Sequence, residues 1–430
     1  MRSLLNRMGN PHQGRNTIHV TGSKGKGSTA TMIASILNQT GFATALFTSP
    51  HLHSYCERIE FNLEPVSEEE FAKGLTEMLP AIEEEMKADS APLSTFGILT
   101  ALFFHLCTTH LPKTHWQVVE VGMGGRFDIT NVFDSTDVVV ITPISLEHAE
   151  ALGSTPTEIA NNKAGIIKPG STTILAPQKD MGARSAVARN CAENRSEFVD
   201  VGRAYKFKQL TQSHTGQTMQ IDRSGESIQV EVPPIGQHQQ LNAVTAVACA
   251  DALAKRGVPV ASKQIIDGLK GTKLPGRLEV MQGDVTEDGK IKGPLVVLDG
   301  AHNHESAAAL AAALKQLFHV EKCIFVVGVN SDKNFTAIWR ELEPLNKFAV
   351  ATRSQNARAL DPSAIQDVIS MFEAEHPDVG VTESVPKAIE KALSIATETD
   401  VVCVMGSLYV VAEAREYLLK HEAGTSNNRK

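Results

Sequence analysis

The segment GSKGKGS, residues 22–28, has the composition of a loop that holds phosphate groups. It follows the apolar run NTIHV (16–20) and precedes a stretch with helical character (27–40), which is the strand–loop–helix order that such a loop requires. Glycines let the backbone curl around an anion, Lys26 can reach the β- and γ-phosphates, and Ser28 offers a hydroxyl. The spacing differs from G-x-x-x-x-G-K-[ST]. A glycine-rich turn with a solvated lysine is the alternative interpretation.

Three more polar segments follow predicted strands. They are FTSPH (47–51), EVGMGGRFDITN (120–131) and ITPISLEHAEALG (141–153). Loops at the carboxyl ends of parallel strands line one crevice, so we expect Ser49, Glu120 and His148 to lie near Lys26. A hydroxyl, a carboxylate and an imidazole can hold Mg²⁺ beside a triphosphate, although histidine is an unusual ligand for so hard a cation.

Each of these residues also has a simpler structural interpretation. Ser49 can cap a turn before Pro50, Glu120 can pair with Arg126, and His148 can be an ordinary loop histidine. The prediction of a site therefore depends on the segments occurring together.

The elements that must position these residues alternate between short β-branched runs and helical stretches. The predicted strands are 16–20, 43–47, 116–121, 137–142 and 172–176, and the predicted helices are 27–40, 67–87, 95–110, 155–163, 180–194 and 238–257. Apolar runs of this kind suit strands that are buried on both faces of a mainly parallel sheet. The pattern predicts an α/β protein.

Two changes in this pattern suggest the domain organisation. Residues 203–232 alternate polar and apolar side chains, which predicts a small antiparallel insert in a first domain of residues 1–273. Residues 274–294 are rich in glycine, proline and charge, and we interpret them as a domain junction. The strand–helix alternation then resumes, which predicts a second open α/β domain over 295–430.

Composition excludes several classes of function. The chain has 430 residues, 42% of them hydrophobic, and a net charge of −8 without a run of Lys and Arg, which argues against a nucleic-acid or membrane partner. No apolar stretch reaches transmembrane length. The six scattered cysteines indicate reduced, mostly buried thiols. We expect a cytoplasmic monomer that acts on small molecules; a mitochondrial location stays open.

Taken together, the motifs resemble the folylpolyglutamate synthase/dihydrofolate synthase family, the folate branch of the Mur-type amide ligases. The resemblance rests on ordered segments from about residue 19 to residue 415. They are IHVTGSKGKGST, FTSPHLHSYCERI, VVEVGMGGRFDITNV, LEHAEALGSTPTEIANNKAGIIKPG, GQHQQLNA, LPGRLEV, VLDGAHN and MGSLYVVAEAR. The resemblance implies a P-loop-type first domain, a Rossmann-like second domain, and an enzyme that uses ATP and Mg²⁺ to join L-glutamate to a carboxylate through an acyl phosphate.

The resemblance also implies roles for individual residues. Nucleotide would be held by Gly22, Gly25, Lys26, Gly27, Ser28, Asn242, Arg277 and Asp299. Two Mg²⁺ ions would be held by Ser49, Glu120, His148 and Lys163, with Lys163 carbamylated as in related enzymes. Lys26, Lys163 and His302 would be catalytic, and Phe96, Arg126, Asp128 and Ser407 would contact the acceptor or glutamate. Without the family, Lys163 would be interpreted as a surface lysine, His302 as a stabiliser of its turn, and Ser407 as a helix cap.

The acceptor and the rival functions stay open at this point. Arg126 and Asp128 resemble the dihydrofolate synthases and bifunctional members, so we expect dihydropteroate as the acceptor. Extension of the glutamate chain of a reduced folate is the alternative. Phe96 could stack on a pterin, although TFGILTALFFH (95–105) equally has the periodicity of a core helix. Rival functions are a ligase for another acid and a catalytically silent, nucleotide-binding regulatory protein.

Several departures from the family pattern are visible, among them Ala149-Glu150-Ala151 where a bulkier residue is common. Lys24 stands where many members have Asn, Glu147 where Asp usually precedes the histidine, and His304 where Pro is frequent. His148 itself is present, and the altered LEHAEALG segment changes its surroundings.

Overall fold

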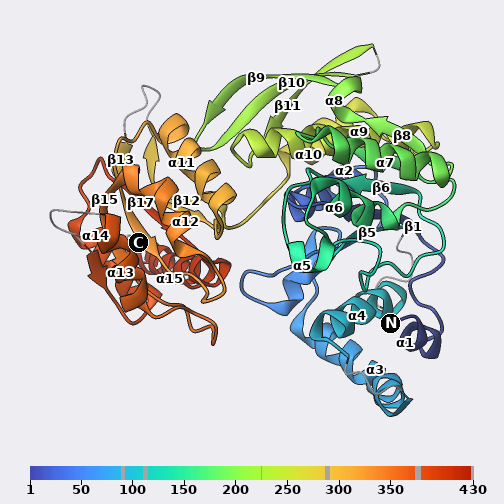
Figure 1. Cartoon of the computed structure of the whole chain (residues 1–430), viewed down its shortest axis with the longest axis horizontal. Helices are drawn as coiled ribbons and strands as arrows, with labels where there is room; N and C mark the ends of the chain where they lie inside the picture. The colour runs from blue at the N-terminus through green and yellow to red at the C-terminus, as the bar shows by residue number, and fades with distance from the viewer. Residues whose placement is uncertain (89–92, 110–114, 224, 286–290, 373–378, 428–430) are drawn as a thin grey trace. The chain divides into compact units, whose positions relative to one another are not determined.

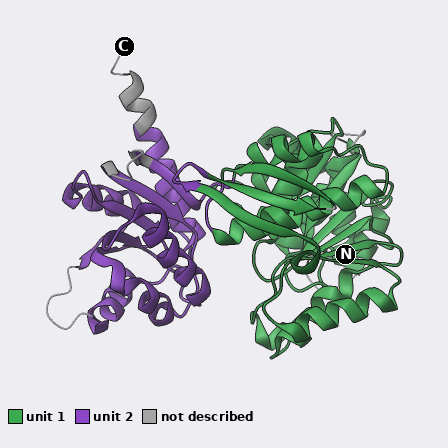
Figure 2. Cartoon of the chain, turned by 90° about the horizontal axis from the view of Figure 1, so that it is seen from above, with its two compact units in different colours: residues 1–211, 217–233, 237–273 green, residues 212–216, 234–236, 274–430 purple. Residues whose placement is uncertain are grey.

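A computed structural model describes residues 1–88, 93–109, 115–223, 225–285, 291–372 and 379–427. The chain forms two compact units (Figure 2). Unit 1 comprises residues 1–211, 217–233 and 237–273, and unit 2 comprises residues 212–216, 234–236 and 274–430. Among the described residues, no helix is both long and apolar enough to cross a lipid bilayer.

Unit 1 is built on a sheet in which the described strands have the order β4-β3-β2-β5-β1-β6-β7-β8 (Figure 1). The strands are β1 Asn16–Thr21, β2 Thr44–Phe47, β3 Ile59–Phe61, β4 Glu64–Pro65, β5 Trp116–Glu120, β6 Val138–Ile141, β7 Thr172–Leu175 and β8 Glu197–Asp200. All pairs from β2 to β8 are parallel, whereas β3 and β4 add antiparallel pairs at one edge. The parallel sheet predicted from the sequence is confirmed, and neither the β3–β4 edge nor the edge strand β8 was foreseen.

Helices cover both faces of this sheet. The α-helices are α1 Arg2–Arg7, α2 Lys26–Asn38, α3 Glu68–Ala88, α4 Thr95–Thr109, α5 Ala149–Leu152, α6 Pro156–Lys163, α7 Met181–Glu193, α8 Val201–Ala204, α9 Gln237–Lys255 and α10 Ser262–Lys270, with 3-10 turns at Tyr55–Arg58 and Ala164–Ile166. Helices α2 and α9 pack on one face, and α10 packs on α2. On the other face, α4 packs with Phe47 and Val119, and α6 and α7 pack with Val139 and Ile141.

The antiparallel insert predicted over 203–232 is present as a three-stranded sheet. Its strands are β9 Lys206–Ser213, β10 Gly216–Arg223 and β11 Glu226–Val232, in the order β11-β10-β9. Buried Asp251 of α9 joins the insert to the helices, because its carboxylate accepts a hydrogen bond from the Tyr205 hydroxyl (2.8 Å) and pairs with Arg223 of β10. Arg223 also donates to Ser262 at the start of α10 (2.8 Å).

Unit 2 is a second α/β unit whose described strands have the order β12-β13-β17-β14-β15-β16. They are β12 Arg277–Val285, β13 Ile291–Asp299, β14 Cys323–Val327, β15 Asn346–Ala351, β16 Val379–Val381 and β17 Val401–Met405. The helices are α11 His304–Phe318, α12 Phe335–Leu342, α13 Pro362–Phe372, α14 Val385–Ile395 and α15 Leu408–Asn427, with a 3-10 turn at Glu343–Leu345. All pairs from β13 to β16 are parallel, and Trp339 of α12 is central to the apolar core.

The predicted junction, 274–294, differs from the structure over most of its length. It contains β12 and the start of β13, which pair antiparallel with Arg277 opposite Asp299; its residues 286–290 lie outside the described residues. The pairing contains register shifts, and Gly283 has a φ of 82°. These irregularities explain why strands here have the composition of a loop.

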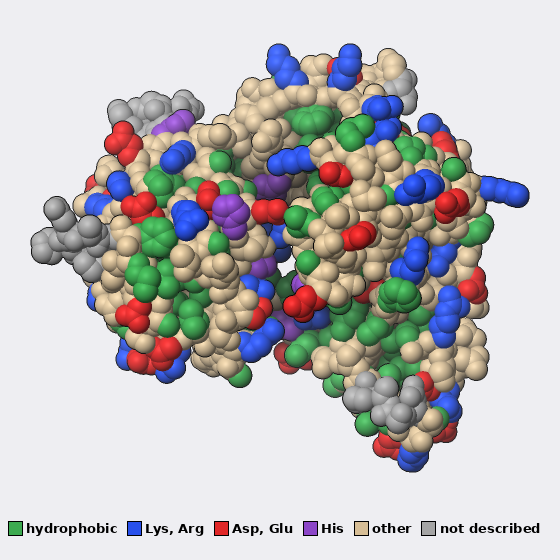
Figure 3. Space-filling view, viewed as in Figure 1, with side chains coloured by type: hydrophobic (Ala, Val, Ile, Leu, Met, Phe, Trp, Pro, Cys, Tyr) green, Lys and Arg blue, Asp and Glu red, His purple; other side chains and the backbone are tan. Residues whose placement is uncertain are grey.

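The predicted burial of the cysteines is confirmed. All six cysteines, 56, 107, 191, 249, 323 and 403, are free and buried. Burial raises the pKa of Cys107 to about 12 and that of Cys191 to about 11. On the face seen in Figure 3, acidic and basic side chains are intermixed.

Candidate functional site

The phosphate-type loop connects β1 to α2 at the carboxyl end of the central strand. Gly25 is the N-cap of α2 and has a φ of 83°, a left-handed conformation that favours glycine. The N–H groups of Ser23 and Lys24 donate to the Pro143 carbonyl (3.0 and 3.3 Å), which holds the loop against the segment after β6. The first turn of α2 contains no acidic residue of its own, and the positive end of the helix dipole favours an anion there.

Three glycines of this loop allow neighbouring side chains to approach the backbone closely. A Cβ atom at Gly22 would lie 1.8 Å from Thr142 Oγ1, one at Gly25 2.2 Å from Asn242 Oδ1, and one at Gly27 3.3 Å from Glu120 Oε2. These contacts place Asn242 of α9 and Glu120 of β5 against the loop. Ser28 follows in the first turn of α2 and is half-buried.

Two lysines converge on the loop from different elements. Lys26 Nζ donates to the Gly22 carbonyl at 3.2 Å, and Lys163 Nζ donates to the same oxygen at 2.8 Å. Lys163 is fully buried and also contacts Glu147 Oε1 at 2.7 Å. The alternative interpretation of Lys163 as a surface lysine is therefore wrong. Burial lowers the pKa of Lys163 to about 8, although the Glu147 carboxylate opposes this effect.

Local signals in the sequence explain how Lys163 is placed. It is the last residue of α6, which starts with a capping box in which the side chains of Thr155 and Glu158 each accept the other's backbone N–H at 3.2 Å. A Cβ atom at Gly125 would lie 2.6 Å from the Lys163 carbonyl oxygen. The glycine-rich segment after β5 thus allows α6 to approach and to direct Lys163 at the loop.

The predicted metal ligands are brought together in part. Glu120 is 3% exposed, and its Oε2 accepts the Ser49 N–H at 2.8 Å. His148 has a φ of 46° and an exposed side chain, and no contact that joins its ring to Ser49 is described. Among the described residues, no group of three or more His, Cys, Asp and Glu side chains could hold a metal ion.

This donor set fits Mg²⁺ only as a partner of phosphate. A buried carboxylate and a nearby hydroxyl are hard oxygen ligands, and Mg²⁺ takes most of its remaining ligands from water and phosphate oxygens. The two lysines that converge on the loop bring positive charge to it, which favours a phosphate over a bare cation.

Two predicted acceptor residues lie together at the end of β5. A Cβ atom at Gly122 would lie 2.6 Å from Phe96 Cζ and 3.3 Å from Asp128 Oδ2. Phe96 also packs on Phe47, with ring centroids 5.8 Å apart, so it is part of the α4 core and lies at its margin. The Arg126 side chain is exposed, and its backbone N–H donates to the Asn162 carbonyl at 2.9 Å.

The other four predicted residues belong to unit 2. A Cβ atom at Gly300 would contact Leu408 Cδ2 (2.5 Å) and Arg277 Nη1 (3.6 Å), so Arg277 lies near the ends of β13 and β17. Asp299 accepts N–H groups of Leu278 (3.0 Å) and Ala301 (2.9 Å), and burial raises its pKa although Arg277 opposes this.

His302 and Ser407 make the contacts that their structural interpretations predict. His302 Nδ1 donates to the Gly300 carbonyl at 2.7 Å within its turn. Ser407 is buried, and its Oγ accepts the Tyr409 N–H at 3.2 Å, so it caps α15. Their roles toward glutamate stay predictions.

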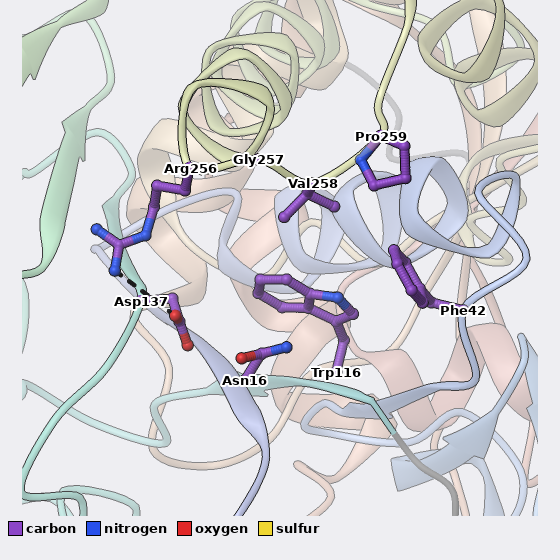
Figure 4. Close-up of a pocket in the computed structure, with 8 residues that line it drawn as sticks. All are labelled: Asn16, Phe42, Trp116, Asp137, Arg256, Gly257, Val258 and Pro259. Carbon is purple, nitrogen blue, oxygen red and sulfur yellow. Dashed lines mark ion pairs between the residues drawn. The ribbon is translucent and has the colours of Figure 1, made fainter.

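A pocket of about 460 Å³ lies at the opposite edge of the sheet in unit 1 (Figure 4). It is lined by Asn16, Phe42, Trp116, Asp137, Arg256, Gly257, Val258 and Pro259. Arg256 pairs with Asp137 at 3.6 Å across its rim. Because Asn16, Trp116 and Asp137 stand at the amino ends of β1, β5 and β6, the pocket is separate from the phosphate-type loop.

Sequence reasoning missed two residues that contact the loop or its buried lysine without being predicted ligands. Glu147 was noted only as a departure, yet it pairs with Lys163, and Thr142 was not singled out although it lies against Gly22. Position at the carboxyl end of β6 was the one signal that pointed to either residue.

Comparison with known proteins identifies matches over nearly the whole chain. The model of the Mur ligase middle domain matches residues 20–250, and that of the Mur ligase, glutamate ligase domain matches residues 276–408. The Bacillus subtilis "Dihydrofolate synthase/folylpolyglutamate synthase" is 31% identical, over 97% of this chain and 94% of its own length.

One further curated relative and one solved structure also match nearly the whole chain. The Halobacterium salinarum "Probable bifunctional folylpolyglutamate synthase/dihydropteroate synthase" is 34% identical over 96% of this chain, and the chain spans 48% of that protein's length. The Mycobacterium tuberculosis folylpolyglutamate synthase, solved with ADP and AMPPCP, aligns with a TM-score of 0.85 and 29% identity, over 97% of this chain and 94% of that one.

Proposed function

The chain belongs to the folylpolyglutamate synthase/dihydrofolate synthase family of Mur ligases, and we propose that it joins L-glutamate to dihydropteroate to form dihydrofolate. It is an ATP-dependent amide-forming ligase of this family. The observation that carries the proposal is the loop at Gly22–Lys26, because Lys26, Lys163 and Glu120 from three separate elements all meet it.

The reaction has two steps. The acceptor carboxylate attacks the γ-phosphorus of ATP, an O–P bond forms, and ADP leaves. The glutamate amine then attacks the acyl carbon, phosphate leaves with the C–O electron pair, and the nitrogen loses a proton. The loop N–H groups and the start of α2 bind the triphosphate, and Lys26 neutralises charge on the transferred group. Asn242, whose Oδ1 approaches Gly25, would contact the nucleotide.

Ser49 and Glu120 are the residues that would hold Mg²⁺, with His148 reached directly or through water. When bound, Mg²⁺ supplies charge neutralisation between the phosphates and the acceptor. Lys163 is suited to carbamylation because burial keeps its pKa near 8, so that a fraction of neutral amine is available to CO₂. Addition forms an N–C bond and releases a proton, and the product would separate from the like-charged Glu147.

The acceptor assignment rests on Phe96, Arg126 and Asp128. An aromatic face next to a carboxylate suits a flat heterocycle with N–H donors, and Arg126 suits an acceptor carboxylate. Chain extension of a reduced folate is the alternative, alone or as a second activity of a bifunctional enzyme. The Bacillus subtilis relative carries both activities in its name, which supports keeping dihydropteroate and reduced folates as candidate acceptors.

An acceptor screen tests the proposal. ATP consumption and glutamate incorporation are measured with dihydropteroate, dihydrofolate and tetrahydrofolate, each with L-glutamate. We expect turnover with dihydropteroate; turnover only with the glutamylated folates would favour the alternative, and none with any of the three would refute both. Lys26→Ala should abolish ligation while the circular dichroism spectrum stays unchanged.

A further inference from the structure

His19 is a buried polar residue that the proposed reaction does not use. It lies on the central strand β1 and is fully buried on the α4 side of the sheet, with its ring edge-on to Phe133 at 5.4 Å. Burial lowers the pKa of His19 to about 3, so the imidazole is neutral at physiological pH. An apolar side chain would fill this position at lower desolvation cost, which suggests that the ring nitrogens serve a purpose.

The ring begins a short chain of hydrogen bonds. His19 Nε2 lies 2.9 Å from Thr130 Oγ1, and Thr130 Oγ1 lies 2.6 Å from Asp128 Oδ1. A hydroxyl has one proton, and the Asp128 carboxylate can only accept, so Thr130 donates to Asp128. His19 must then donate from Nε2. Its Nδ1 is buried and has no hydrogen-bond partner within the described part of the chain, which fits a ring that carries its proton on Nε2.

The chain ends at the predicted acceptor site. Besides the Thr130 hydroxyl, Asp128 accepts the backbone N–H of Thr130 on Oδ1 (2.9 Å) and that of Met123 on Oδ2 (2.8 Å). Oδ2 also lies next to Gly122, on which the Phe96 ring packs. The carboxylate is therefore fixed in orientation, and Oδ2 keeps capacity for a further donor beside an aromatic face.

We infer that His19 is a positioning residue that acts through Thr130 to orient the Asp128 carboxylate for an N–H donor of the heterocyclic acceptor. The inference rests on the proposed function for the identity of the acceptor. The hydrogen-bond chain itself does not depend on it. An Asp128 that has lost the Thr130 hydroxyl, and is held only by the backbone N–H groups of Thr130 and Met123, would still bind the heterocycle, with lower affinity, because part of its orientation would have to be fixed on binding.

The kinetic test compares isosteric and conservative variants. Thr130→Val removes the hydroxyl at equal volume, and Thr130→Ser keeps it. We expect Thr130→Val and His19→Leu to raise KM for the acceptor by about tenfold, the effect of one hydrogen bond to a charged group, with KM for ATP unchanged. Thr130→Ser and His19→Gln, which keep the donors, should remain within about threefold of the wild type. In an Asp128→Asn background, Thr130→Val should add nothing.

Three results would each overturn the inference. The first is an equal rise in acceptor KM for Thr130→Val and Thr130→Ser, and the second is a parallel rise in KM for ATP. The third is a full additional effect of Thr130→Val in the Asp128→Asn background. If His19→Leu does not fold, the comparison of Thr130→Val with Thr130→Ser still tests the inference. A second measurement needs no substrate: nitrogen NMR of ring-labelled histidine, with the His19 signals assigned by their loss in His19→Gln. We expect the neutral Nε2–H tautomer, and an Nδ1–H or doubly protonated ring refutes the chain even if the acceptor screen fails.

Discussion

The loop predicts a specific outcome for Gly25→Ala, because two separate costs can be worked out. Gly25 has a φ of 83°, where an L-residue costs about 1 kcal/mol. The new Cβ would also stand 2.2 Å from Asn242 Oδ1, and Asn242 is 3% exposed and donates to Gln239 Oε1 at 2.9 Å. Displacing a buried, hydrogen-bonded side chain adds about 2 kcal/mol. We expect a total of about 3 kcal/mol from these two costs.

The same helix offers a matched control. Gly41 lies after the other end of α2 with a φ of 78°, and nothing stands within 4 Å of its Cβ position. Gly41→Ala should therefore cost only the backbone term of about 1 kcal/mol. In an Asn242→Ala background, Gly25→Ala should cost about as much as Gly41→Ala, because the displaced group is gone.

Thermal unfolding, monitored by tryptophan fluorescence, measures the loss of stability in each variant. The chain has two tryptophans, so a Trp339→Phe background leaves Trp116 of β5 as the reporter of unit 1. At about 2–4 °C per kcal/mol, Gly41→Ala should lower Tm by about 3 °C and Gly25→Ala by about 9 °C. Equal shifts for the two single variants, or no relief from Asn242→Ala, would refute the close approach of α9 to the loop.

Three further changes test other parts of unit 1. Lys163 has a lowered pKa in the native state, so between pH about 8 and about 10.5 the unfolded chain holds a proton that the native chain has lost; stability relative to Lys163→Met should rise by about 3 kcal/mol across that window in urea titrations, and a fall would contradict the lowered pKa by showing that the native state stabilises the ammonium. Asp251→Asn should lower the urea unfolding free energy by about 2 kcal/mol because Arg223 loses its buried charged partner and keeps the more exposed Glu226 at 2.8 Å as its ion-pair partner, whereas Asp267→Asn, in a more exposed ion pair, should change it by less than about 0.5 kcal/mol; equal effects would contradict this. Glu120→Gln should raise the Mg²⁺ concentration needed for half-maximal ligation, and an unchanged Mg²⁺ titration would remove Glu120 from the metal site.

The fold could be predicted where local pattern and burial agree. The parallel strands β1, β5, β6 and β7 of unit 1 are largely apolar or β-branched and buried on both faces, so period and composition point to one state, whereas the more exposed edge strand β8 gave no such signal. Prediction failed where tertiary pairing overrides composition. β12 contains glycine and charged residues because its ladder with β13 is irregular, and the short β3 and β4 pair only at a sheet edge.

The candidate site likewise contains residues that local sequence reveals and residues that only tertiary structure brings together. Gly22, Gly25 and Lys26 follow each other in sequence, so their spacing shows a loop for an anion. The burial of Lys163 depends on a helix that docks 141 residues away from Gly22, and no local signal records it. The partnership of Glu147 with Lys163 is equally a product of tertiary structure.

The distribution of the cysteines has a practical consequence. Unit 1 contains Cys56, Cys107, Cys191 and Cys249, whereas unit 2 contains Cys323 and Cys403. Every one is enclosed in its own unit, so a thiol-alkylating reagent modifies it only during a transient opening of that unit. Pulse alkylation followed by peptide mass mapping would therefore time the opening of each unit separately in the unaltered chain. The same experiment with added nucleotide would show which unit the ligand holds closed.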